Sequence, residues 1–222
     1  MRWAMLHNMN HQKKVDVRRS AVRRFMAVGP VLLGLTLLIP NVCAQEVTFQ
    51  LDPAQSRVQF TLGATFHEVH GTFQLKGGTI HFNPANGEAS GSLIVDATSG
   101  NTGNERRDRR MHRQILEDQK YPEIVFSPQH VSGKIAPQGT SQMEMQGLLT
   151  LHGEQHPITF TAPVQVNQTQ ASAEVHFTLP YMKWGLKNPS TFVLRVSDKV
   201  SVDVHAVGRL SSVGGAHGHS GT

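Results

Sequence analysis

The sequence predicts an all-β fold, a closed antiparallel barrel with one short helix, and three observations support this prediction. From Gln45 onward apolar and polar residues alternate with a period of two, as in strands that have one buried and one solvated face. The alternating runs are numerous, and short connections join them, as in barrels and sandwiches. A single segment departs from the alternation and has helical spacing instead. We favour a barrel over a sandwich because closure leaves no exposed strand edge.

The first 44 residues have the pattern of a signal peptide. Basic residues run directly into an apolar stretch, residues 26–39, which is shorter than the roughly 20 residues of a membrane-spanning helix. Val42-Cys43-Ala44 has the small-residue pattern that signal peptidases accept. We therefore expect a Sec-type signal cleaved after Ala44, a periplasmic or secreted protein, and no integral membrane span after cleavage. A lipidated Cys43, a twin-arginine signal at Arg23-Arg24 and a later start methionine stay open.

Removal of this segment changes the charge of the protein. The chain of 222 residues has 21 Lys and Arg and 16 Asp and Glu, of which seven cations and one acid precede Gln45. The remaining 14 basic and 15 acidic residues give a net charge of −1, so we expect no nucleic-acid partner. Cys43 is the only cysteine in the sequence, and an exported domain without thiols depends on a hydrophobic core for its stability.

The predicted barrel domain covers residues 45–210. Its alternating runs are residues 47–51, 58–62, 69–75, 80–82, 91–97, 124–126, 143–151, 158–166, 173–179 and 200–206. Asp52-Pro53 breaks the first run, because proline cannot continue a strand ladder. Gly77-Gly78 predicts a tight turn before Ile80, and residues 83–87 predict the turn of the next hairpin. Residues 211–222 are rich in Gly, Ser and His, and we expect a disordered tail.

The predicted helix covers residues 104–119. It places Met111, Ile115 and Leu116 on one face, and Glu105 precedes Arg109 by four residues, a favourable order for a helical ion pair. Tyr121-Pro122 ends the helix, because the residue before a proline avoids the helical conformation. A single amphipathic helix in a β chain is expected to lie across one opening of the barrel and plug it.

The chain resembles the YceI-like family of exported lipid-binding proteins along nearly the whole predicted domain. The resemblance depends on an ordered set of residues: Asp52, Ser56, Val58, Phe60, Gly71-Thr72-Phe73, Gly78, Ile80, Phe82, Arg106, Asp108, Lys120-Tyr121-Pro122, Ile124, Phe126, residues 147–153 and Pro157-Ile158. It implies an extended antiparallel eight-stranded barrel, similar to a lipocalin, whose interior binds a polyisoprenoid or another long-chain amphiphile. The chain departs from the family pattern at residues 115–119, which lack a paired aromatic, and at residues 63–70, where Thr65, His67 and His70 replace a lone histidine.

The predicted ligand site is the apolar interior. Its candidate lining residues are Phe60, Leu62, Phe73, Ile80, Phe82, Leu93, Val95, Met111, Ile115, Leu116, Phe126, Leu149 and Phe177. A buried methylene gains about 0.8 kcal/mol, so an apolar chain needs few directed contacts. Arg106 and Asp108 are candidate head-group contacts because they fall on the family pattern, whereas the other arginines of the helix are expected to form a solvated face.

Neither a catalytic nor a metal site is predicted from the motifs. His67 and His70 lack the His-Glu-x-x-His spacing of zinc peptidases, and on a strand they would point to opposite faces. We found no nucleophile with a base and an orienting acid. The sequence therefore predicts a carrier or sequestering protein for an isoprenoid, quinone-like or fatty-amide lipid, without chemistry and without a cofactor.

Two alternatives stay open. An eight-stranded barrel can be filled by its own side chains, which would make the protein a structural or stress-response barrel that acts through surface contacts. A hydrolase with a site assembled from residues distant in the sequence is the other alternative. A homodimer is also possible.

Overall fold

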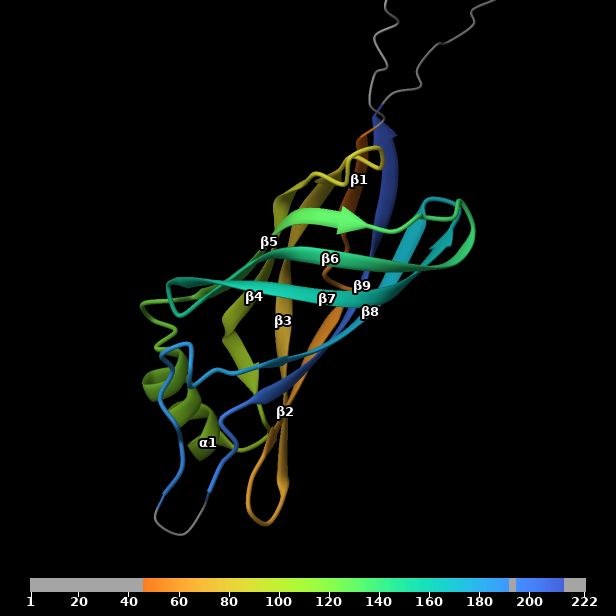
Figure 1. The fold of residues 1–222 in the computed structure, drawn as a ribbon. Coiled ribbons are helices and arrows are strands. Elements are labelled where there is room, and N and C mark those ends of the chain that lie inside the picture. The colour runs from red at the N-terminus through yellow and green to blue at the C-terminus, as the bar shows by residue number, and fades with distance from the viewer. Residues whose placement is uncertain (1–45, 192–194, 214–222) are drawn as a thin grey trace, which may run out of the picture. The chain divides into compact units, whose positions relative to one another are not determined.

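The alternating runs of the sequence form nine strands, with one helical segment between the fourth and the fifth (Figure 1). The structure is a computed structural model and describes residues 46–191 and 195–213. The elements are β1 (Glu46–Leu51), β2 (Arg57–Gly63), β3 (Glu68–Phe82), β4 (Ala89–Asn101), α1 (Glu105–Arg110), η1 (Met111–Leu116), β5 (Glu123–Ser132), β6 (Gly139–Leu151), β7 (Glu154–Asn167), β8 (Gln170–Leu179) and β9 (Val200–Val213). The predicted signal peptide, its cleavage site and Cys43 lie outside the described residues.

The sheet closes on itself with eight strand positions. Consecutive strands from β3 to β9 are antiparallel neighbours, and β9 pairs with β1 and β2, which both pair with β3. β1 lies against residues 79–82 of β3, whereas β2 lies against residues 68–73. β1 and β2 are therefore two halves of one interrupted strand. The predicted fold, an all-β antiparallel eight-stranded barrel with one short helix, is confirmed.

The interruption between β1 and β2 is bonded to the closing strand. The Asp52 N–H donates to the Val207 carbonyl at 2.8 Å, and the Val207 N–H donates to the Ser56 hydroxyl at 2.9 Å. A hydrogen bond from the Gln55 side chain holds the pKa of the Asp52 carboxyl below its ordinary value. These contacts keep the barrel closed where Pro53 cannot donate to the ladder.

The turn predicted at Gly77-Gly78 is wrong. β3 runs through both residues, and its register against β4 shifts between Leu75 and Gly77, which is a β-bulge. The two glycines have φ values of 140° and 138°, and a Cβ on Gly78 would lie 2.1 Å from the Ser92 carbonyl oxygen. The glycine pair therefore bends one long strand instead of ending it.

The last strand is longer than predicted. β9 extends to Val213, because Ser211 and Ser212 pair with Thr48 and Val47 of β1. Residues 211–213 thus belong to the barrel and not to the predicted tail, whose remaining residues lie outside the described part of the chain.

The helical segment is shorter than predicted and changes its winding. The Asn104 side chain accepts a hydrogen bond from the Arg107 N–H at 3.1 Å and caps α1, which continues as the π-helical turn η1. Helical structure ends at Leu116, three residues before the predicted end at Gln119, because Glu117 adopts the left-handed conformation with φ of 49°. No helix among the described residues is long and apolar enough to span a membrane.

Candidate ligand-binding site

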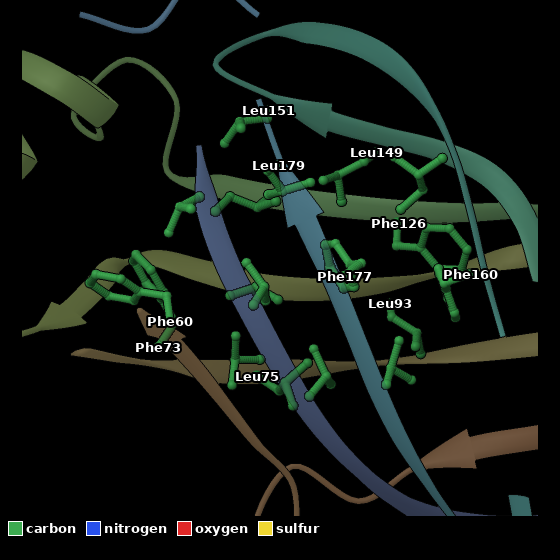
Figure 2. Close-up of a pocket in the computed structure, with 18 of the residues that line it drawn as sticks. Phe60, Phe73, Leu75, Leu93, Phe126, Leu149, Leu151, Phe160, Phe177 and Leu179 are labelled. Atoms are coloured by element: carbon green, nitrogen blue, oxygen red, sulfur yellow. The ribbon is translucent and has the colours of Figure 1, made fainter. Parts of the chain in front are cut away.

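The barrel encloses a cavity of about 670 Å³. Inward-facing side chains of the strands form its wall, and Figure 2 shows Phe60, Leu93, Phe126 and Phe177 pointing into the space between them. Known pockets for small molecules have volumes of about 300–1,000 Å³. The geometry therefore favours a barrel that admits a guest molecule over one filled by its own side chains.

The structure places all thirteen predicted apolar residues in the cavity wall. They are Phe60, Leu62, Phe73, Ile80, Phe82, Leu93, Val95, Met111, Ile115, Leu116, Phe126, Leu149 and Phe177. Sequence reasoning missed other wall residues of the same alternating runs, among them Phe49, Met143, Met145, Phe160 and Val202. Alternation shows which face of a strand is buried, so it also marks these positions. Their roles as ligand contacts stay predictions.

Small residues beside the aromatic rings keep the cavity open. A Cβ on Gly71 would lie 2.3 Å from the Phe60 ring, and a Cβ on Gly100 would lie 2.6 Å from the Phe73 ring and 2.7 Å from Met111 Cε. Phe60 and Phe73 also pack against each other, with ring centroids 5.3 Å apart. These rings can lie near the wall because the glycines leave room for them.

Most polar residues of the cavity wall gather where α1 meets the barrel. Thr102, Asn104, Arg106, Arg107 and Arg110 line the cavity there, and His67 of the β2–β3 hairpin also lines it. None of the described wall residues is acidic. This end therefore offers hydrogen-bond donors and positive charge to a ligand oxygen.

Only one of the two predicted head-group residues lines the cavity. Arg106 does, whereas the Asp108 carboxylate accepts hydrogen bonds from the N–H (3.0 Å) and the hydroxyl of Thr102. The Arg107 guanidinium donates to the Thr102 hydroxyl at 2.7 Å and to the Thr102 carbonyl at 2.9 Å. Asp108 thus fixes the entry into α1 and does not line the cavity. Arg107, which is half-buried, and Arg110, which is exposed, also line the cavity, so the arginines of the helix face both the cavity and the solvent.

Two segments cover this end of the barrel, and only the helical one was predicted. Leu116 of η1 packs in one buried cluster with Leu151, Tyr181 and Leu186. Tyr181 and Leu186 belong to the β8–β9 connection, whose Trp184 ring stacks on His156 with centroids 4.2 Å apart. The connection has no alternation and no helical period, so its packing could not be predicted from the residue pattern.

Polar contacts also hold the two covering segments. The Lys187 ammonium donates to the Glu117 carboxylate at 2.7 Å and, by this bond, lowers the pKa of Glu117. The Tyr181 hydroxyl donates to the Ser197 carbonyl at 2.7 Å, and burial raises the pKa of Tyr181. These bonds join the β8–β9 connection to itself and to the end of the helix.

His112 fastens the helical segment to the barrel. Its Nδ1 lies 2.5 Å from Asp118 Oδ2, and its Nε2 lies 2.8 Å from the Gly100 carbonyl oxygen of β4. The two ring nitrogens thus contact a side-chain oxygen and a backbone oxygen on either side of the ring. The side chain thus joins η1 to the strand that lines the cavity.

The YceI-like domain matches residues 49–208 of this chain. The chain belongs to the YceI-like family. A UPF0312 protein of Vibrio cholerae is 27% identical to this YceI-like protein over 144 residues, which are 63% of this chain and 72% of the relative.

Two solved structures share the barrel of this YceI-like protein. Burkholderia cenocepacia BcnA has a TM-score of 0.60 and 17% identity, over 71% of this chain and 98% of BcnA. A polyisoprenoid binding domain from Saccharophagus degradans, implicated in plant cell wall breakdown, has a TM-score of 0.60 and 18% identity, over 73% of this chain and 98% of that domain. At these identities the similarity establishes the fold.

Histidine and acidic residues do not assemble into a metal site within the described ranges, where no group of three or more such side chains could hold an ion. His176 pairs with Asp203 at 2.6 Å and His205 with Glu174 at 2.5 Å, and these residues do not line the cavity. The pairs join β8 to β9 on the outside of the barrel.

Proposed function

We propose that this YceI-like protein binds a long-chain amphiphile, of the polyisoprenoid class, in the barrel interior and carries or sequesters it without chemistry. The observation that supports this proposal is the cavity of about 670 Å³, with an apolar wall and with three arginines at one end. The polyisoprenoid binding domain from Saccharophagus degradans has the same fold.

The apolar wall accounts for the tail of such a ligand. Each methylene that leaves water gains about 0.8 kcal/mol, so ten buried carbons gain roughly 8 kcal/mol before the cost of ordering the chain. Isoprenoid, quinone-like and fatty-amide tails all meet this requirement. The wall therefore selects for length and slenderness more than for a particular chemical group.

The arginines account for the head group. Arg106 and Arg110 form no ion pair with any described residue, and the Arg107 guanidinium is already held by Thr102. A guanidinium donates readily to carboxylate, phosphate or carbonyl oxygens. The ligand is thus expected to lie with its oxygen-bearing end at α1 and its tail along the barrel.

Loading in solution tests this proposal. Wild-type protein should release a long-chain lipid on organic extraction, detected by mass spectrometry, and should bind a fluorescent long-chain probe without vesicles. Phe82→Glu should abolish loading, because it buries a carboxylate in the apolar wall, where Phe82 is 7% exposed. Gln74→Glu, at an exposed position of the same strand, is the control.

A second variant guards against a folding defect in the first. Leu93→Trp adds bulk to the wall without adding charge, and it should reduce probe binding while the circular dichroism spectrum is kept. Unchanged loading in a folded Leu93→Trp or Phe82→Glu protein would show that the interior is not the site.

An exported location fits this role, since the source of a long-chain amphiphile is a membrane. It is tested by sequencing the N-terminus of the protein recovered from the periplasm or medium, which should begin at Gln45. A cytoplasmic protein with an intact N-terminus would contradict the proposed location.

A further inference from the structure

An exposed aromatic ring stands at the rim of the cavity. Phe66, at the tip of the β2–β3 hairpin, is 78% exposed, while Ala64 and His67 beside it line the cavity. Backbone bonds fix this tip: the Ala64 N–H donates to the His67 carbonyl at 3.0 Å, and the Thr65 N–H donates to the Arg195 carbonyl at 3.0 Å. The hairpin tip is therefore ordered, and it carries the Phe66 ring in an exposed position.

This tip belongs to the helix end of the barrel, by which we mean residues 64–67, 102–121, 180–191 and 195–199 (Figure 1). The other large apolar side chain that is exposed among the described residues, Met182 at 38%, belongs to the same end. Every other large apolar residue of the described chain is at least partly buried. Among the residues whose burial the structure describes, large exposed apolar side chains therefore lie only at the helix end.

The basic residues of the domain are concentrated at this same helix end, whereas most acidic residues lie elsewhere. The helix end carries ten of the fourteen Lys and Arg residues between positions 46 and 213, but only five of the fifteen Asp and Glu residues. Three of those five acids are paired within the helix end or with its neighbours, since Glu105 contacts Arg109, Glu117 contacts Lys187 and Asp118 contacts His112. Glu68, next to the tip, reduces the positive excess by only one charge.

We propose that the helix end docks on the surface of an anionic phospholipid bilayer, with Phe66 inserted among the head groups and the basic side chains beside the phosphates. The proposal rests on the proposed function for the identity of the cargo. A docked barrel would bring the rim at Ala64 and His67 to the lipid surface, so an apolar ligand would enter the cavity without passing through water.

The physical chemistry favours a bilayer over an acidic protein surface. A single exposed ring with scattered cations around it can bind a lipid bilayer, because the bilayer is deformable and needs no shape complementarity with the protein. A protein interface would need a larger apolar patch. Among the described residues, Phe66 and Met182 are the only large apolar side chains that are exposed. Docking of this kind weakens as salt is raised, because it depends partly on screened charge.

Vesicle flotation tests the proposal. Because all strands of the closed barrel lie between Glu46 and Val213, the test uses a chain that begins at Gln45 and so lacks the apolar N-terminal segment. Phosphatidylcholine vesicles with phosphatidylglycerol should bind it, those without should bind it much less, and high salt should release it. Phe66→Ser should weaken binding about tenfold or more through the loss of ring burial.

A charge variant away from the cavity wall gives an independent test. The triple variant Arg113→Gln, Arg195→Gln and Lys199→Gln should lower the vesicle partition constant by well over about tenfold, since each cation near an anionic membrane contributes about a factor of five. The control is Lys134→Gln with Arg209→Gln, which removes cations outside the helix end and should change binding by less than about twofold.

A spectroscopic variant locates the ring. Phe66→Trp should keep vesicle binding, and brominated lipids should quench its fluorescence more strongly than that of the wild-type chain, whose half-buried Trp184 supplies the background to subtract. Equal binding to neutral and anionic vesicles, or binding that neither the Phe66→Ser nor the triple variant weakens, would overturn the docking proposal, as would salt-sensitive binding to an acidic protein but to no vesicle.

Loading in vesicle-free solution separates this proposal from the proposed function. Phe66→Ser and the triple variant should load the fluorescent long-chain probe as the wild type does. If the wild type docks on anionic vesicles but never loads, the proposed cargo is wrong while docking stands. If it loads but does not dock, the docking proposal fails alone.

Discussion

Single residues decide how much of the barrel interior is open. The wall contains large rings, and an eight-stranded barrel is just wide enough to be filled by such side chains. Gly100 and Gly71 prevent this, because their missing Cβ atoms leave room for the Phe73 and Phe60 rings beside the strands. The alternation of the sequence predicted which side chains point inward. It could not predict that glycines opposite them would keep the rings near the wall.

Gly100→Ala should therefore reduce ligand loading. The new methyl group would meet the Phe73 ring at 2.6 Å and Met111 Cε at 2.7 Å, so both side chains must move toward the cavity. We expect the affinity for a long-chain probe to fall by about tenfold, with folding retained, as measured by fluorescence titration and thermal unfolding. Gly63→Ala is the matched control, since its Cβ would meet only Ser197 Cβ at 3.9 Å. Equal affinities of the two variants would contradict this role of Gly100.

At the scale of elements, the helical segment and the β8–β9 connection act together as the cover of the helix end. The sequence predicted the first from its helical period but placed its end three residues too late, because nothing in the pattern marks the left-handed Glu117. The second has no period, and its position follows from tertiary contacts of Tyr181 and Leu186. Apolar periodicity predicts helices and strands, whereas the position of a covering loop depends on tertiary contacts that leave no repeating pattern in the sequence.

His112→Ala should loosen this cover. The substitution removes the contacts of η1 with Asp118 and with the Gly100 carbonyl and leaves a largely buried carboxylate unpaired, which should lower the free energy of unfolding by about 1–3 kcal/mol. Faster exchange of a bound fluorescent probe, measured by stopped flow, should accompany the loss.

His176→Ala supplies the comparison for that experiment. It breaks a histidine–carboxylate pair of similar length, 2.6 Å, but on the exposed outside of β8. Its stability and its exchange rate should stay close to wild type, because exposed pairs contribute little. An exchange rate that rises equally in both variants would show that the His112 contacts do not restrain the cover.

At the scale of the whole molecule, closure depends on two halves of one strand. β1 and β2 together complete the ring between β3 and β9, and the excursion from Asp52 to Ser56 is bonded to Val207. The sequence predicted closure and the break at Pro53. It could not predict that both halves share one position, because register depends on partners more than 100 residues away in the chain.

Ser56→Ala tests this closure. The hydroxyl accepts from the Val207 N–H at 2.9 Å and donates to the Asp52 carbonyl at 2.7 Å, so its removal leaves a part-buried N–H without this partner. We expect the free energy of unfolding to fall by about 1–2 kcal/mol in chemical denaturation. Ser201→Ala on β9, whose hydroxyl bonds to no described group, should cost less than about 0.5 kcal/mol. A loss of the same size in both variants would argue against a special contribution from Ser56.

The pairing of Glu46 with Val213 has a practical consequence for how this protein can be handled. These two positions are neighbours in the ladder. They lie near residues 79–82 of β3, at the opposite end of that strand from the β2–β3 hairpin. A tether attached at either position would therefore hold the barrel at the end opposite the helix end and leave the helix end facing the solution. Protein immobilised on a surface in this way should consequently exchange a bound ligand as freely as protein in solution. A short peptide that joins the two positions would also allow circular permutation, with new termini placed in another loop.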